Sequence, residues 1–373
     1  PVVDLGWEPQ FLITKVVNSN NWHMWDSMRG VTTGGNDSRL YPNLDNVEDE
    51  SEKLQLTSTG FQIKSSSLSI NTSGVETIYM AIRAPMMKEP EAATDVFAAV
   101  TRNSSVGGVN YYTGFPTDLS IYNARTNTTG YAHTRLTAYN RLVMTTSAAE
   151  ISGNFDFDSN VGYQLGTGST NTNAFTLNWK RAKGFFDVVA YSGNGASGRG
   201  VNHSLSVIPE MVWVKARSTG ENWNVLVPSI ISGNTGRLTL NESGAAEASV
   251  QHYFGNGTNY VAPTSTQFTV ESGTATNSAS HTYIAYLFAT LAGISKVGSF
   301  VGNGSSQTIS CGFSSGSRFI LIRRTDANGD WYVWDSVRGI VAGNDPYLLL
   351  NGTAAQVTND DSVDPHNSGF IVN

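Results

Sequence analysis

The sequence has little cysteine and no long apolar run, and each shortage excludes a class of protein. Its single cysteine, Cys311, leaves no intrachain disulfide framework and no cluster of thiolate metal ligands. No run of about 18 apolar residues occurs, so we expect no insertion into a membrane. The first residues, PVVDLGWEPQ, lack the basic start and apolar core of a cleaved signal, so export by that route is not expected.

Charged residues are also scarce, at 14% of the chain against roughly 25% in ordinary domains. The formal net charge is −7 and Lys and Arg form no cluster, so nucleic acid is not an expected partner. Glycine is abundant instead, with 37 residues, together with Ser, Thr and Asn. This composition favours short strands joined by hydrogen-bonding turns over long amphipathic helices.

One motif occurs twice, as WHMWDSMRG at 22–30 and as WYVWDSVRG at 331–339. Each copy follows an apolar, strand-like run that ends in basic residues, FLITK at 11–15 and FILIRR at 319–324. The chain therefore repeats a strand followed by a tryptophan segment, which is the kind of periodicity that defines repeat architectures.

A third copy begins with MVWVK at 211–215, and Trp223 then takes the place of the first tryptophan of the motif. Leu-rich and Phe-centred segments follow each copy in the same order. A more divergent copy lies between, beginning with TDLSIYNAR at 117–125. The sequence thus contains about four units, at a spacing of roughly 100 residues, a typical size for a β-sandwich module.

Within each unit, apolar and polar residues alternate, as in TYIAYLF at 282–288. A period of two is typical of strands with one buried face. We therefore predict an all-β chain of tandem antiparallel β-sandwich, jelly-roll-like modules. The predicted units are 1–90, 91–184, 185–293 and 294–373. The first lacks an opening strand and the fourth a closing strand, so we interpret the sequence as a window from a longer array.

Opening strands are predicted for the later units from segments that share a pattern. They are DVFAAVTRN at 95–103, FFDVVAYSGNG at 185–195 and KVGSFVGNG at 296–304. The Asn-Gly pairs of the last two are strong hairpin-turn signals.

The order of these segments resembles tandem β-sandwich domains of marine bacteriophage tail and fibre proteins, which are related in outline to concanavalin-like and laminin-G-like jelly rolls. The resemblance rests on F-D-V-V-x-Y-x-G-N-G, H-S-L-x-x-x-P-E-M-x-x-V-K, N-W, L-x-x-N-x-x-A-A and T-Y-I-A-Y-L-F-A. It is most specific over 1–85 and 185–373 and weakest over 95–184.

This resemblance implies a virion structural protein, a tail fibre or tail-tip appendage that attaches to host-surface glycans. Two alternatives stay open: a capsid decoration or head-fibre protein, and a concanavalin-like polysaccharide hydrolase. The expected partners are other virion proteins of the tail, baseplate or capsid, a host glycan, and further copies of the chain, with a trimer as one form. The chain would be assembled in the host cytoplasm and exposed on the particle surface. No catalytic residue or cofactor is implied.

The candidate glycan-binding residues are Trp25, Trp223 and Trp334. Tryptophans three apart on a strand point to opposite faces, so one ring of each W-x-x-W pair is expected to face outward and stack on a sugar. The alternative is that both rings pack, one inside the unit and one against its neighbour. Repetition in several units favours this packing interpretation.

No metal site is expected, although Asp156, Asp158 and Asn160 alternate oxygen ligands in a pattern that suits Ca²⁺. A turn is the alternative interpretation. The D-S-x-R-G segments after Asp26 and Asp335 also predict turns, in which the aspartate accepts backbone N–H groups and glycine supplies a permissive φ.

Overall fold

The computed structural model shows an all-β chain. It describes residues 1–18, 21–31, 37–57, 59–65, 70–83, 87–102, 109–137, 139–153, 155–157, 159–165 and 171–373. The strand pairings of these residues are antiparallel. The helices among them are short 3-10 turns: η1 (Ala93–Asp95), η2 (Arg135–Thr137), η3 (Pro228–Ile230) and η4 (Val250–His252). None has the length and apolar character needed to cross a membrane. The predicted all-β, sandwich-type fold is confirmed.

The first unit is a small two-layer sandwich with its own core. One layer is β3 (His23–Asp26), β2 (Pro9–Val16) and β8 (Thr77–Arg83), in that order. The other is β1 (Val2–Asp4), β7 (Gly60–Ile63) and β6 (Leu54–Thr57), and β4 (Asp37–Arg39) pairs with β5 (Asp49–Ser51) beside them. Leu12 and Trp25 on the first layer pack against Leu56 and Phe61 on the second.

The second unit has a six-stranded and a three-stranded sheet. The larger contains, in order, β14 (Ile151–Ser152), β13 (Asn140–Val143), β12 (Tyr131–Thr134), β11 (Leu119–Ala124), β17 (Ala174–Trp179) and β9 (Phe97–Thr101). The smaller contains β10 (Tyr111–Tyr112), β16 (Gly162–Leu165) and β15 (Phe155–Asp156). Tyr111, Tyr122 and Phe157 contribute to an aromatic core between them.

The third and fourth units repeat this scheme with fewer strands. The third has β18 (Phe186–Ser192), β24 (Thr282–Phe288), β20 (Met211–Ala216), β21 (Asn224–Leu226) and β22 (Leu238–Thr239), plus β19 (Arg199–Asn202) paired with β23 (Gln267–Val270). The fourth has β26 (Phe319–Ile322), β27 (Tyr332–Asp335) and β28 (Leu348–Leu349), plus β25 (Gln307–Ser310), β30 (Gly369–Val372) and β29 (Val363–His366). Each sheet of the described residues lies within one predicted unit; the boundaries themselves stay a prediction.

The two tryptophan motifs occupy the same place in their units. In the first unit Leu12 pairs with Trp25 and Ile13 with Met24, and in the fourth unit Ile320 pairs with Trp334 and Leu321 with Val333. The register between the two strands is therefore identical. Each motif forms a strand and a turn, with no helix.

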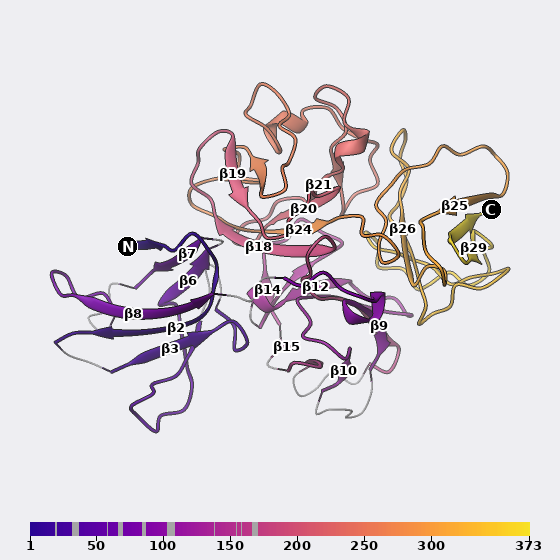
Figure 1. Cartoon of the computed structure of the whole chain (residues 1–373). Helices are drawn as coiled ribbons and strands as arrows, with labels where there is room; N and C mark the ends of the chain where they lie inside the picture. The colour runs from indigo at the N-terminus through magenta and orange to yellow at the C-terminus, as the bar shows by residue number, and fades with distance from the viewer. Residues whose placement is uncertain are drawn as a thin grey trace.

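A shared core joins the second, third and fourth units. The outer faces of their β11, β20 and β26 sheets meet in the largest hydrophobic cluster of the described residues. Figure 1 shows these units around a common centre, with the first unit to one side. Equivalent positions contribute from each unit: Leu142, Leu238 and Leu348 form one set, and Met144, Leu240 and Leu350 another. Each of these sheets is thus covered on both faces.

The predicted opening strand of the fourth unit is wrong. Residues 296–304 have no regular structure, whereas their counterparts form β9 and β18. In the third unit β18 pairs with β24, and in the second β9 pairs with β17. The fourth unit of this sequence contains no equivalent of β24 or β17. The segment therefore has no strand to bond, and Val301 is 87% exposed.

Because one core serves three units, we expect a cavity in one unit to destabilise all three. Leu348→Ala should cost about 2 to 5 kcal/mol, as buried Leu→Ala changes do. Hydrogen exchange measured by mass spectrometry should then speed up in β11 and β20 as well as in β27, by tenfold or more given about 1.4 kcal/mol per decade.

Leu12→Ala is the matched control, because Leu12 belongs to the hydrophobic core of the first unit. It should speed exchange in β2 and β3 and leave β20 unchanged. Faster exchange confined to the fourth unit in Leu348→Ala would contradict a shared core.

Candidate functional site

The first tryptophan of each motif is held by one asparagine clamp. Its backbone N–H donates to an asparagine Oδ1: Trp22 to Asn43 at 2.9 Å, Trp223 to Asn241 at 2.8 Å and Trp331 to Asn351 at 3.0 Å. The Nδ2 of the same asparagine donates to the side chain that precedes the tryptophan, at 2.8 to 3.0 Å. Three equivalent copies of this arrangement identify the motif as part of the architecture.

Two of these tryptophans reach into the preceding unit. The indole Nε1–H of Trp223 donates to the carbonyl oxygen of Val143 at 2.8 Å, and that of Trp331 donates to the carbonyl of Thr239 at 3.0 Å. Val143 and Thr239 are equivalent positions, each following the repeated Arg-Leu pair. The junction between the second and third units is therefore repeated between the third and fourth.

A backbone contact extends the series to a third junction. The N–H of Glu150 donates to the carbonyl of Arg217 at 2.7 Å, and the N–H of Ala246 donates to that of Thr325 at 2.8 Å. The N–H of the equivalent Gln356, in the fourth unit, donates to Arg125 of the second unit at 3.1 Å. The three units thus contact one another in a closed ring, with approximate threefold symmetry around the shared core.

The third junction differs because its tryptophan is missing. Gly130 stands at the position of Trp223 and Trp331. The N–H of Met144 donates to the carbonyl of Gly130, just as the N–H of the equivalent Leu240 donates to the carbonyl of Trp223. No indole can therefore enter the fourth unit there. Instead the N–H of Ala355 donates to Asn127 Oδ1 at 2.7 Å.

The three candidate glycan-binding tryptophans are buried. Trp25 and Trp334 pack inside their own units and Trp223 in the shared core. A sugar ring stacks only on an accessible aromatic face. The geometry corrects the expectation of an outward ring at these positions and fits the alternative of packed rings. Trp22 differs, with 37% of its surface exposed.

The aspartates of the two motifs stabilise their turns as predicted. One carboxylate oxygen of Asp26, and one of Asp335, accepts the backbone N–H groups of the second and third residues after it, at 2.9 to 3.0 Å. Gly30 and Gly339, which end the motif, have φ values of 96° and 110°, a region that favours glycine.

The arginine of the fourth-unit motif has a second role. Arg338 is buried, its Nε donates to Asp335 Oδ2 at 2.6 Å, and its guanidinium lies 4.8 Å from the ring centre of Phe175 in the second unit. Burial lowers the pKa of Arg338, although Asp335 opposes that shift. This pair therefore helps to close the ring.

An ion pair between Arg181 and Glu8 links the first unit to the ring. The Nη1 and Nη2 of Arg181 each donate to one carboxylate oxygen of Glu8 at 3.1 Å, and its Nε donates to Asp187 Oδ1 at 2.7 Å. Burial alone lowers the pKa of Arg181, but the carboxylates of Asp187 and Glu8 more than offset this and raise it. The same junction includes apolar residues, since Leu56 of the first unit and Val189 of the third line one small pocket.

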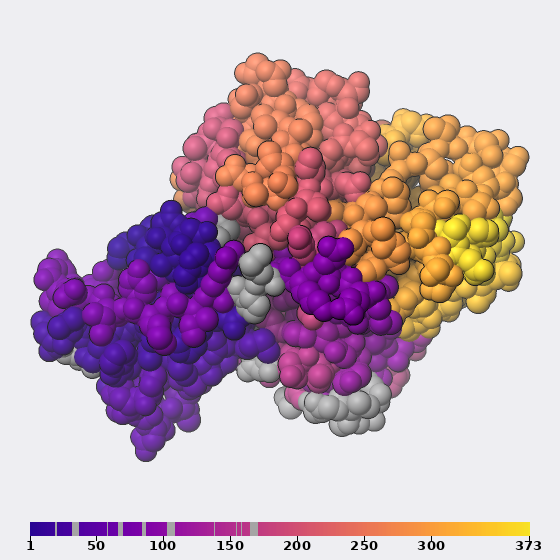
Figure 2. Space-filling model, in the orientation of Figure 1, coloured from indigo at the N-terminus to yellow at the C-terminus, as the bar shows by residue number. Residues whose placement is uncertain are grey.

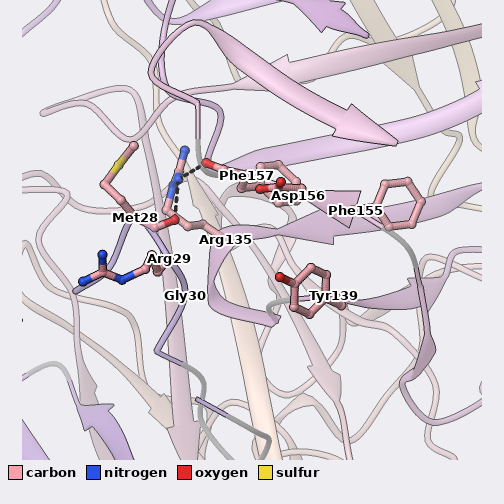
Figure 3. Close-up of a pocket in the computed structure, with 8 residues that line it drawn as sticks. All are labelled: Met28, Arg29, Gly30, Arg135, Tyr139, Phe155, Asp156 and Phe157. Atoms are coloured by element: carbon pink, nitrogen blue, oxygen red, sulfur yellow. Dashed lines mark hydrogen bonds between the residues drawn. The ribbon is translucent and has the colours of Figure 1, made fainter. Parts of the chain in front are cut away.

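A small pocket lies at the same boundary (Figure 3). Arg135 crosses it and bonds the carbonyl oxygens of Phe157 and Met28. Its free volume is about 10 Å³, room for about one water molecule. The pocket therefore resembles a packing defect between two units.

The metal candidate gains no support from this pocket. Asp156 lines it together with the cationic Arg29 and Arg135. Asp158 lies outside the described residues, and Asn160 is exposed. Within the described ranges, no group of three or more His, Cys, Asp or Glu side chains is placed to hold a metal ion.

One surface escaped the sequence analysis: the outer face of β3, β2 and β8, which we define as Phe11, Ile13, Met24, Ile78, Met80 and Ile82. Cross-strand pairing aligns Met24, Ile13 and Met80 on that face, opposite Trp25, Leu12 and Ala81. Ile78, Met80 and Ile82 are 46, 52 and 50% exposed. The sequence shows the alternation of TIYMAIR at 77–83, but it does not show which face of the strand other residues cover.

The architecture defines a class, a tandem all-β protein whose units share cores. A family model described as "Domain of unknown function (DUF7483)" matches residues 1–85 and 163–373, more than half of the chain. The chain belongs to this family. Residues 86–162, which the model does not match, fall mostly in the second unit, the one with the most divergent copy. No curated protein and no solved structure matched the chain.

Trp331 provides a test of the junction. Trp331→Ala should lower the free energy of unfolding by about 3 to 5 kcal/mol, the usual cost of removing a buried tryptophan. Trp331→Phe keeps most of the packing but leaves the Thr239 carbonyl without its indole partner, so we expect a loss of about 1 to 3 kcal/mol. Urea unfolding followed by circular dichroism measures both.

The control for this series is Val301→Ala, at a highly exposed position of the same unit. It should change stability by less than about 0.5 kcal/mol. If Trp331→Ala were as stable as that control, the indole would not contribute to the stability of the junction.

Buried His133 makes stability depend on pH. Burial among aromatic rings, and then the charge of Arg141, lower the pKa of His133 well below 6.5. The folded state keeps the imidazole neutral while the unfolded state takes a proton near pH 6.5, so stability present above that pH is lost as the pH falls. The loss approaches about 1.4 kcal/mol per pH unit for one proton.

Urea unfolding between pH 7.5 and pH 5 should therefore show a shallower pH dependence for His133→Leu than for the parent chain. Replacement of the exposed His366 by Gln is the control and should keep the parental dependence. Parallel curves for His133→Leu and the parent would show that His133 takes up a proton while folded.

Proposed function

We propose that this chain is a structural component of a bacteriophage virion, a tail-fibre or tail-tip appendage that holds host-attachment surfaces away from the particle. The resemblance to tandem, concanavalin-like β-sandwich domains of phage tail and fibre proteins supports the virion assignment. Attachment to a host glycan is the part of the proposal that depends on exposed side chains, because Trp25, Trp223 and Trp334 are buried.

The observation that carries the proposal is the repeated junction. Trp223 and Trp331 make the same indole contact with successive units, and three equivalent backbone bonds close the ring. Such contacts fix each unit against its neighbours with apolar packing on both sheet faces. A rigid body of this kind suits a part that transmits position or force, as an appendage does.

Immunogold electron microscopy tests this assignment. Antibodies raised against the purified chain should label fibres or the tail tip of particles of the phage that encodes it. Gold on the capsid would favour the decoration or head-fibre alternative. Unlabelled particles, with the antigen found only in the infected-cell lysate, would rule out a virion component.

A glycan array tests the attachment role separately. Beads that carry many copies of the folded chain should retain fluorescently labelled host polysaccharide more strongly than the single chain does, because weak sites gain avidity when they are linked. Suppose that neither the single chain nor many copies coupled to a bead bind polysaccharide, while the antibodies do label tail fibres. The chain would then be a spacer in the fibre and would not be an adhesive component.

A further inference from the structure

The outer face of β3, β2 and β8 is equivalent to the faces that form the shared core. Aligned apolar runs place Ile13 at the position of Ile121 and Trp213. Ile121 lies between Ala132 and Leu177, and Trp213 between Val225 and Tyr286. Those residues are all buried in the shared core.

In the first unit the same register places Ile13 between Met24 and Met80. Met80 is thus the equivalent of Leu177 and Tyr286, yet it is 52% exposed. Figure 2 shows the first unit as a lobe of its own, with the purple atoms of the β8 region at its surface. One unit of the chain therefore leaves open the surface that the other three bury.

We propose that three copies of this chain associate through the outer face of β3, β2 and β8, which packs around a threefold axis as the equivalent sheets of the second, third and fourth units do. The occupant follows from the ring itself. Each face in the shared core is covered by the same face of two other units. Units of this shape therefore close in threes, and the first unit lacks its two companions within the chain.

The equivalent contacts can be named in advance. Trp22, at the position of Trp223 and Trp331, directs its indole toward the carbonyl of Tyr41 in the next copy, because Tyr41 is equivalent to Val143 and Thr239. Polar groups at the rim give the interface its register, and the apolar residues at its centre supply most of its stability.

A backbone bond completes each interface. Glu48 corresponds to Glu150 and Ala246, and Val17 to Arg217 and Thr325. The N–H of Glu48 therefore donates to the carbonyl of Val17 in the adjacent copy. Both residues are exposed in the single chain, as this contact requires.

The mass of the purified chain tests the proposal. Sedimentation equilibrium from roughly 1 to 100 µM, which brackets a micromolar interface, should show a species of three times the chain mass. Met80→Asp places a charge at the centre of each face, where a desolvated carboxylate has no partner, and should yield the monomer over the whole range. Met80→Leu should keep the trimer.

Val301→Asp is the matched control, since it adds the same charge at an exposed apolar position outside this face. It should stay trimeric. Circular dichroism shows whether each variant folds, which Met80→Asp should do because its side chain is exposed in the single chain. As a second readout, the Glu48 amide should exchange hydrogen more slowly in the parent than in Met80→Asp.

A monomeric parent at every concentration, a dimer, or a trimer that persists in Met80→Asp would each overturn the proposal. The result is independent of the virion role, because the self-association of the purified chain does not depend on where the particle carries it. Trimeric mass with absent particle labelling would support this interface and reject the appendage.

Discussion

Burial of one sheet face from each of three units in a common core is the constraint on which the structure depends. A sandwich of this size has a thin core of its own, and strands such as β11, β17 and β18 are buried on both faces. Each buried aliphatic or aromatic side chain contributes about 1.5 to 3 kcal/mol, against about 1 kcal/mol for a typical hydrogen bond. The shared core therefore stabilises the ring, and polar contacts select its geometry.

The tryptophan motif links these two contributions. The asparagine clamp holds the backbone of Trp331, and its indole donates to the Thr239 carbonyl of the neighbouring unit. Three residues later Trp334 fills the core of its own unit. One short segment thus connects the inner core of a unit to the core that the unit shares. Repetition of such a segment reflects a packing requirement that recurs at every junction.

The sequence predicted what is local and repeated. Alternating runs gave the strands, the twin motif gave the equivalent pairs, and Asp26 and Asp335 cap the turns as expected. It failed where the outcome depends on a distant partner. KVGSFVGNG has the pattern of a strand but nothing to pair with, and Trp22 and Trp331 share a motif while one is partly exposed and the other buried. Pairing partners and neighbouring units are set by tertiary packing, and local pattern does not encode them.

In the first unit, the sequence nevertheless indicates that a packing partner is absent from the single chain. This unit joins the ring through contacts such as Arg181–Glu8 and Gln55–Ser192, while Ile78, Met80 and Ile82 on its outer face stay exposed. A solvent-facing strand commonly carries Thr, Lys or Glu at alternate positions, and β8 instead carries Ile78, Met80 and Ile82 there. Exposed apolar faces of this kind mark interaction surfaces or cause aggregation. The pattern of β8 is that of a core strand, which implies a packing partner beyond the single chain.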